Sequence, residues 1–293
     1  MKRYVVNLDR SKERMAWFAR QAAAQRVDFT RVPAVDGRNL TVGELASYHA
    51  RCPPRRSISF GELGCFLSHV RIWKRMVAER TPWAFIAEDD LHFGCDAETF
   101  LGRDDWLPPA VDVIKAETLF TRVELSAAAL AVPLGHALRG LRSFHGGSAG
   151  YFVSLGGASR LLAFSEVHCE PLDHFIFGQS HRTGHGLVIA QLDPAICVQD
   201  DQLPNGVGLT SDLDVERDDF LRHHPLSRRP RGARRIVREL RRLAGYMWGP
   251  VRRLALTAAG TSIFAPVPIT LEGRTVAERR RKPHPESVLR AAE

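Results

Sequence analysis

Apolar and polar stretches alternate along the chain in a way that predicts strands followed by helices. Apolar residues 4–8 indicate a first strand, and residues 12–25 have a helical pattern with Met15, Phe18, Ala19 and Ala22 on the side expected to be buried. Further strands are expected at residues 28–35, 85–87, 111–114 and 151–154. Strands that alternate with helices are typical of an α/β domain, and we expect a mostly parallel sheet.

The clearest helical pattern runs from residue 60 to residue 77. Ser59 and Glu62 have the three-residue spacing of a capping box, which marks the start of a helix. One stripe at helical spacing holds the apolar side chains Leu63, Phe66, Leu67, Val70, Trp73 and Val77. Ser68 and His69 interrupt this apolar surface, and hydrogen bonds to the local backbone are their ordinary explanation. Residues 39–57 have the character of a long loop, and residues 157–164 indicate a short helix.

Three carboxylates, Glu88, Asp89 and Asp90, follow the apolar run of residues 85–87 directly. Ligands of open α/β sheets bind beyond the strand ends, where such side chains lie. Side chains alternate along an extended segment, so Glu88 and Asp90 are expected to share a face and Asp89 to point the other way. Mg²⁺ and similar hard cations prefer carboxylate oxygens together with substrate phosphates. We therefore interpret Glu88 and Asp90 as ligands of Mn²⁺ or Mg²⁺; a solvated turn is the alternative.

Polar residues also follow the first two predicted strands. Asn7, Asp9 and Arg14 lie where a nucleotide would bind beyond the first strand, and an arginine fork matches phosphate oxygens. Asp36 can accept hydrogen bonds from ribose hydroxyls, while Gly37 permits close approach of the backbone. A solvated arginine and a plain Asp-Gly turn are the alternatives.

The net charge of +8 is concentrated near the C-terminus. Residues 228–253 contain ten arginines and one glutamate, whereas the chain before them is slightly acidic. We expect a catalytic domain over residues 1–215 and a basic, partly helical extension over residues 216–293. The five cysteines are odd in number and scattered without a Cys-x-x-Cys pair, so the sequence indicates neither a disulfide framework nor a zinc site.

The arginine-rich segment has the pattern of an amphipathic helix. One side carries Arg234, Arg235, Arg238, Arg241 and Arg242, and the opposite side is apolar and includes Trp248. A basic face of this kind favours attachment to anionic lipid, although packing on the domain is the alternative. The apolar residues 4–8 are too short for a signal peptide. We expect a cytoplasmic protein held peripherally at the cytoplasmic face of the inner membrane.

Several ordered blocks of the sequence together resemble glycosyltransferase family 25, which includes bacterial lipooligosaccharide and collagen galactosyltransferases. The resemblance covers roughly residues 1–200, and its blocks are residues 5–10 with Arg14, residues 34–37, residues 61–69, residues 88–90, residues 147–151 and residues 171–174. It implies a GT-A-like, Rossmann-type domain that binds a nucleotide sugar, with UDP-galactose the leading donor. It also favours donor binding for Arg14, Ser68, His69 and Asp89.

The resemblance implies a role for Asp173, which stands at the start of an apolar helical stretch. Inverting transfer needs a base within reach of the acceptor hydroxyl, and Asp173 is our candidate. His174 could assist, bind the cation, or simply pack and form hydrogen bonds. The resemblance implies a reaction that moves a sugar, with galactose favoured, to a glycan or lipid-linked glycan of the cell surface.

Two other classes of protein are compatible with parts of the sequence. A nucleotidyltransferase can also end a strand in acids, but the chain lacks a Walker-type phosphate loop. A non-catalytic nucleic-acid-binding protein is suggested by the arginine-rich segment, whereas the acidic character of the remaining chain argues against nucleic acid as a partner.

Overall fold

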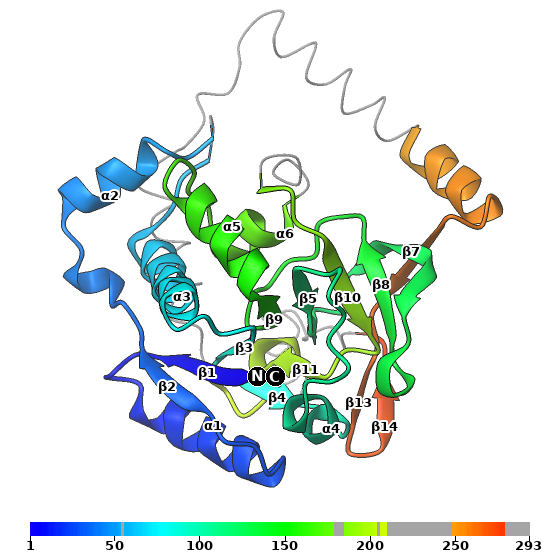
Figure 1. Ribbon diagram of the computed structural model, residues 1–293, viewed down its shortest axis with the longest axis horizontal. Helices are drawn as coiled ribbons and strands as arrows, with labels where there is room; N and C mark the ends of the chain where they lie inside the picture. Colours follow the sequence, from blue (N-terminus) through cyan, green and yellow to red (C-terminus); the bar gives the residue numbers. More distant parts are fainter. Residues whose placement is uncertain (54–55, 179–184, 204–205, 210–247, 279–293) are drawn as a thin grey trace, which may run out of the picture.

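The computed structural model describes residues 1–53, 56–178, 185–203, 206–209 and 248–278, and a large sheet lies at its centre (Figure 1). In this part of the chain the sheet has nine strands in the order β12-β7-β8-β10-β5-β9-β3-β1-β2. Their bounds are β1 Lys2–Asn7, β2 Thr30–Pro33, β3 Trp83–Glu88, β5 Val113–Lys115, β7 Arg122–Ala131, β8 Ala137–Leu141, β9 Gly150–Ser154, β10 Ile189–Asp193 and β12 Ser262–Pro266. The α/β class predicted from the sequence is therefore correct.

The prediction of a mostly parallel sheet is wrong. β1 is parallel to β2 and β3, and β10 is parallel to β5, but the other neighbouring pairs are antiparallel. Parallel neighbours need a crossover, which α1 (Lys12–Ala24) supplies between β1 and β2. The short η2 turn (Pro133–Gly135) between β7 and β8 permits only antiparallel pairing, and β9 enters antiparallel between β3 and β5. The sheet is therefore mixed.

Helices cover both faces of the sheet, and each face has its own apolar core (Figure 1). On one face α3 (Phe60–Ala78), α5 (Leu155–Ser165) and α6 (Leu172–Phe177) pack against strand residues such as Tyr4 and Ile86. On the other face α1 and α4 (Ala97–Gly102) pack against Val5 and Phe85. Adjacent strand residues thus enter opposite cores, which gives three layers.

The helices confirm the strong local signals and correct the weak ones. Ser59 and Glu62 form the predicted capping box of α3, and Leu63, Phe66, Val70 and Trp73 are buried. In α1, however, Trp17 is buried with Phe18 and Ala22, whereas Ala19 is exposed. The expected loop over residues 39–57 begins at the end of η1 (Gly37–Asn39) and contains the helix α2 (Val42–His49). α2 begins at a second capping box, Thr41 with Glu44.

Two smaller sheets complete the fold. One joins β4 (Leu91–Phe93), β11 (Cys197–Gln199) and β6 (Glu117–Thr118). Its strand β4 begins directly after the carboxylates Glu88, Asp89 and Asp90. The other is the hairpin of β13 (Ile269–Leu271) and β14 (Arg274–Val276). The short η4 turn (Asp200–Gln202) follows β11 and brings the Asp200 amide to the carbonyl oxygen of Asp90 at 3.0 Å.

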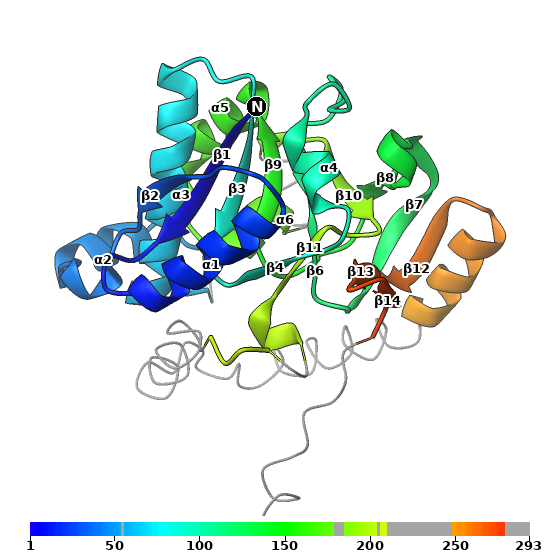
Figure 2. The ribbon, with the colours of Figure 1, turned by 90° about the horizontal axis from the view of Figure 1, so that it is seen from below.

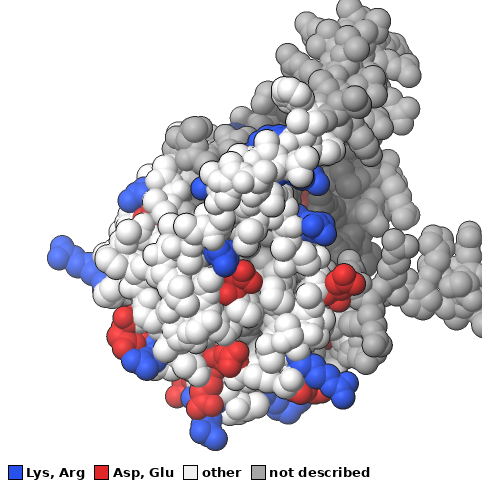
Figure 3. All heavy atoms as spheres, turned by 90° about the vertical axis from the view of Figure 1, so that its right-hand side faces the viewer, with Lys and Arg blue, Asp and Glu red and all other residues white. Residues whose placement is uncertain are grey.

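Part of the expected C-terminal extension, residues 216–293, belongs to the main sheet. β12 pairs with β7 along the far edge of the sheet, and the helix of residues 248–258 lies beside it (Figure 2). Arg252 of this helix makes a 2.8 Å ion pair with Glu124 of β7. On this side of the molecule the described atoms show basic and acidic side chains interspersed (Figure 3). Most of the arginine-rich segment, residues 228–247, lies outside the described residues. Among the described helices, none is long and apolar enough to cross a membrane.

Candidate active site

A cavity opens where the parallel strands β1, β2 and β3 end, and we call it the strand-end cavity. Asn7 ends β1, Glu88 ends β3, and the segment after β2 supplies Asp36 and Gly37. Parallel strands bring their carboxyl ends to one edge of the sheet, where α/β folds bind ligands. Of the residues predicted for the donor and the cation, the cavity is lined by Asn7, Arg14, Asp36, Gly37, Ser68, Glu88, Asp89 and Asp90.

Two of the three carboxylates at the end of β3, those of Asp89 and Asp90, pair with Arg14. Arg14 of α1 makes an ion pair with Asp89 and a second, of 3.1 Å, with Asp90. The Asn7 amide donates a hydrogen bond of 2.6 Å to Asp89. The extended conformation ends at Glu88, so Asp89 turns toward the cavity together with its neighbours, and the expectation that it points away is wrong.

Burial of these carboxylates disfavours their charged forms. It raises the pKa of Asp90 to about 7, and the opposing effect of Arg14 is smaller. Burial, together with the nearby Asp90, raises the pKa of Glu88 well above its usual range. Within the described residues, Asp90 Oδ1 is buried without a hydrogen-bond partner. A buried acceptor oxygen amid excess negative charge suits a hard cation, which Glu88 and Asp90 would hold.

One wall of the strand-end cavity depends on glycines that let α3 approach the segment after β2. A Cβ at Gly64 would lie 2.6 Å from the Val35 carbonyl oxygen, and one at Gly37 would lie 2.3 Å from the Phe60 carbonyl oxygen. Ser68 then accepts a 2.8 Å hydrogen bond from the Val35 amide and donates one of 2.7 Å to the Gly64 carbonyl. Ser68 therefore fixes the wall through the backbone while also lining the cavity.

Two predicted donor residues lie elsewhere. His69 is fully buried behind the cavity wall, and its Nδ1 lies 2.8 Å from the Tyr151 hydroxyl. Burial lowers the pKa of His69 to about 3, so the imidazole is neutral. Asp9 lies in a neighbouring hollow with Asn39 and Arg71, and it pairs with Arg31 at 2.5 Å. Neither residue lines the strand-end cavity.

A second cavity, which we call the Asp173 cavity, adjoins the first. Asp173 stands in the first turn of α6, and its carboxylate accepts hydrogen bonds from the His174 amide at 2.7 Å and the Gly147 amide at 3.4 Å. The two cavities share the lining residues Cys65, Glu88, Asp90 and Gln199. The candidate cation ligands therefore lie at the junction, with the predicted base on one side and most of the predicted donor residues on the other.

His174 does not line either cavity. Its ring stacks on Phe144 with centroids 4.3 Å apart, and its Nε2 lies 3.2 Å from the Arg56 guanidinium. Packing and hydrogen bonding, one of the three roles considered for it, match this placement.

The sequence did not single out several residues of the site. Gly61, Cys65 and Ser68 follow the four- and three-residue spacing of one helix face, so the periodicity of α3 could have identified Cys65. Gln199 reaches the junction only because β11 pairs with β4. Below the Asp173 cavity, buried Lys115 and Glu117 form a 2.8 Å ion pair. No local pattern in the sequence predicts this ion pair.

This ion pair holds the turn that contacts Asp173. Lys115 donates a 2.6 Å hydrogen bond to the Gly147 carbonyl, and Glu117 accepts one of 2.9 Å from the Ala149 amide. Gly147 has φ +80°, and a Cβ there would lie 2.9 Å from the Glu117 carboxylate. Glycine is thus required at this turn, which places the Gly147 amide toward Asp173.

The three-layer fold and the acidic cavity at its strand ends define an α/β domain with a ligand-binding crevice. The family model of glycosyltransferase family 25, described as an LPS biosynthesis protein, matches residues 1–176. The chain belongs to this family and is a glycosyltransferase, as its sequence blocks indicated.

Relatives with assigned names agree with this membership. The lacto-N-neotetraose biosynthesis glycosyltransferase LgtB of Neisseria gonorrhoeae is 29% identical over 209 residues, which cover 68% of this chain and 75% of that protein. The lipooligosaccharide biosynthesis protein lic2B of Haemophilus influenzae is 26% identical over 231 residues, 74% of this chain and 84% of that protein. A glycosyltransferase involved in glycosylation of the major capsid of PBCV-1 is a solved structure with 11% identity, a TM-score of 0.36, and coverage of 76% of this chain and 98% of its own.

Proposed function

We propose that the protein is a metal-dependent, inverting glycosyltransferase that moves galactose from UDP-galactose to a hydroxyl of a lipooligosaccharide or lipopolysaccharide acceptor. The observation that carries this proposal is the junction of two cavities at Glu88 and Asp90. The nucleotide sugar occupies the strand-end cavity and the acceptor enters the Asp173 cavity. The names of the relatives from Neisseria and Haemophilus support a glycan acceptor of the bacterial surface.

The donor half of the proposal rests on charge and strand position. Glu88 and Asp90 would hold Mn²⁺ or Mg²⁺ there, and such a cation would neutralise negative charge on the diphosphate leaving group. Arg14 and Asn7 fix Asp89 beside them, so the carboxylates keep their positions when the donor binds. Asp36 stands beyond β2, where its carboxylate can accept hydrogen bonds from ribose, and its ion pair with Arg10 orients it.

The acceptor half of the proposal rests on Asp173. Its carboxylate faces the cavity that meets the donor side at Glu88, and it takes the proton of the acceptor hydroxyl as that oxygen bonds to the anomeric carbon. The bond between the anomeric carbon and the diphosphate oxygen breaks as the new bond forms, so the configuration inverts. The amide hydrogen bonds from Gly147 and His174 hold the carboxylate in place.

Attachment to the cytoplasmic membrane surface would bring the enzyme to lipid-linked acceptors. The arginine-rich segment suggests it, and helix 248–258, which continues from that segment, leaves Trp248, Val251 and Leu254 mostly exposed. A truncation is a poor test, because β12 lies further along the chain and pairs with β7. Full-length protein with Arg234, Arg235, Arg238, Arg241 and Arg242 changed to glutamine should no longer co-sediment with anionic vesicles, and wild type should release as salt rises. Wild type that ignores such vesicles at low salt would exclude the attachment.

The central test is hydrolysis of a panel of nucleotide sugars with Mn²⁺ and with chelator. We expect release of nucleoside diphosphate, fastest from UDP-galactose and absent with excess chelator. Asp90→Asn should lose this activity, whereas Asp105→Asn, which alters an exposed ion pair with Arg103, is the matched control. Full activity in chelator would overturn the cation assignment. In a separate incubation with nucleoside triphosphates and sugar phosphates, release of pyrophosphate would identify a nucleotidyltransferase.

The role of Asp173 is tested by separating binding from transfer. Asp173→Asn should abolish transfer to acceptor and leave the affinity for UDP with Mn²⁺ unchanged, because the base acts on the acceptor. Loss of UDP binding in a folded Asp173→Asn protein would place Asp173 in the donor site.

A further inference from the structure

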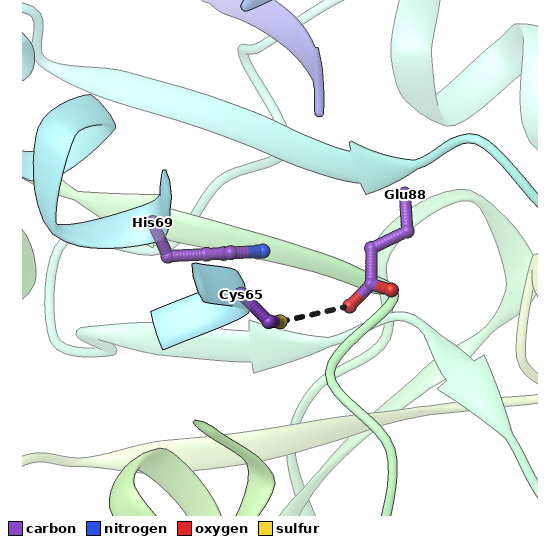
Figure 4. A group of neighbouring side chains, drawn as sticks. All are labelled: Cys65, His69 and Glu88. Atoms are coloured by element: carbon purple, nitrogen blue, oxygen red, sulfur yellow. Dashed lines mark hydrogen bonds between the residues drawn. The ribbon is translucent and has the colours of Figure 1, made fainter. Parts of the chain in front are cut away.

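We propose that Cys65, His69 and Glu88 form a binding site for Zn²⁺ at the junction of the two cavities. Figure 4 shows the three side chains converging from α3 and from the end of β3. Their ligand atoms all lie within 4.8 Å of one another. This site shares Glu88 with the hard-cation pair but offers a different set of donor atoms.

The positions of the three residues follow from the fold. Cys65 and His69 are four residues apart on α3, so their side chains lie on the same side of the helix. Glu88 is the last residue of β3, on which α3 packs, and its Oε1 is 3.9 Å from the Cys65 sulfur. Ligand atoms around tetrahedral zinc are roughly 3.5 Å apart. Side-chain rotations that move the ligand atoms of Cys65, His69 and Glu88 by about 1 Å would therefore complete the site.

His69 supplies an observation that points independently to a ligand. Its Nε2 is buried and, within the described residues, has no hydrogen-bond partner. The other ring nitrogen, Nδ1, lies 2.8 Å from the Tyr151 hydroxyl and can donate its proton to that oxygen. Nε2 then presents its lone pair on the side of Cys65 and Glu88 (Figure 4). Histidine ligands of zinc usually donate the second ring N–H in this way, which fixes the tautomer and the ring orientation.

The chemistry of the donor atoms selects the metal. Thiolate and imidazole suit Zn²⁺, whereas Mg²⁺ and Mn²⁺ prefer oxygen ligands. Three protein ligands with a fourth position open resemble zinc sites that keep a place for water or a second molecule. Cys65 and Glu88 line both cavities, so an ion can reach the site from solvent. When Zn²⁺ binds, the sulfur–hydrogen bond of Cys65 breaks, the proton goes to solvent, and the sulfur bonds to the metal.

Zinc at this position draws Glu88 away from its neighbour Asp90. The two ions then compete for one carboxylate at the place where the proposed donor and acceptor meet. The consequence concerns the proposed function, but binding of Zn²⁺ itself does not depend on sugar transfer and can be measured without substrate.

The test uses metal-free full-length protein and Co²⁺ as a spectroscopic substitute for Zn²⁺. Wild type should bind one Co²⁺ with an absorption band from thiolate-to-metal charge transfer, and Zn²⁺ should remove that band while Mg²⁺ should not. Cys65→Ser should lose the band, and its affinity for Zn²⁺, measured by competition with a chromophoric chelator, should fall at least about tenfold. His69→Gln, with folding checked by circular dichroism, should weaken Zn²⁺ binding by a similar factor.

Two other cysteines provide matched controls. Cys95→Ser changes an exposed thiol. Cys52→Ser changes a thiol that contacts Cys169, and these two thiols together could compete for the metal. Both variants should keep the band. Absence of the band in wild type, its persistence in Cys65→Ser, or its loss in Cys52→Ser alone would overturn the proposal.

Discussion

Replacement of Gly64 by alanine tests whether the close contact of α3 with the segment after β2 shapes the strand-end cavity. The added Cβ would lie 2.6 Å from the Val35 carbonyl oxygen and 3.0 Å from the Gly37 amide nitrogen. Both are backbone atoms, so no side chain can rotate away. Either α3 or the cavity wall has to move.

The expected cost follows from two opposing effects. Overpacking a well-packed contact typically costs about 1–3 kcal/mol, and a 2.6 Å approach to backbone belongs to the upper part of that range. Alanine within a helix gains about 1 kcal/mol over glycine. The net loss of unfolding free energy should therefore be about 1–2 kcal/mol. A shifted wall also disturbs the hydrogen bond from the Val35 amide to Ser68 and moves Asp36.

Urea unfolding and UDP binding measure the two consequences separately. Gly64→Ala should unfold at lower urea with an unchanged slope, and its affinity for UDP with Mn²⁺ should fall. Gly43→Ala is the matched control, since Gly43 lies in α2 and its added Cβ would meet nothing nearer than 3.9 Å. That variant should be as stable as wild type or slightly more so. If Gly64→Ala behaves like Gly43→Ala in both assays, the close contact does not shape the cavity.

Two further predictions concern the buried polar groups below the Asp173 cavity. Glu117→Gln should lower the free energy of unfolding in urea by about 3–5 kcal/mol, because it leaves Lys115 charged and buried. The double change Lys115→Met with Glu117→Leu should lower it clearly less. Equal losses in the two variants would contradict the ion-pair argument. Burial lowers the pKa of His145 to about 3, so the folded protein holds it neutral, and stability should fall as pH drops below about 6.5, by at most about 1.4 kcal/mol per pH unit from this group. His145→Gln should reduce that slope, and an unchanged slope would refute the assignment.

Local sequence signals predicted the parts of the site that one segment specifies. The capping box at Ser59 determined the start of α3 because both partners lie within one turn. Glu88, Asp89 and Asp90 could be placed at a strand end because the apolar run before them stops abruptly. The predicted direction of the Asp89 side chain was wrong because side chains stop alternating where β3 stops pairing. The end of β3 depends on its pairing with β1 and β9.

Long-range pairing determines the features that the sequence did not predict. β9 enters antiparallel between β3 and β5, and β12 returns to β7 from about 140 positions later in the chain, as the pairing of Phe264 with Glu124 shows. Neither pairing has a local signature, so a parallel sheet and a separate extension were reasonable expectations. Gln199 and the ion pair of Lys115 and Glu117 join the site through the same kind of pairing.

The buried carboxylates at the junction reduce the stability of the folded protein when no ligand is bound. Folding brings Glu88, Asp89 and Asp90 together and buries Asp90, and in the described part of the chain Arg14 is the one cation in ion-pair contact with Asp89 and Asp90. Such an arrangement opposes folding, because burial raises the pKa of Asp90 and of Glu88 instead of stabilising their charges. Proteins retain local conflicts of this kind mainly at functional sites, where a ligand supplies the missing interaction. A cation relieves the conflict directly, because it replaces the lost hydration of both carboxylates. The unfavourable charge balance is thus the physical link between the fold and the proposed metal-dependent transfer.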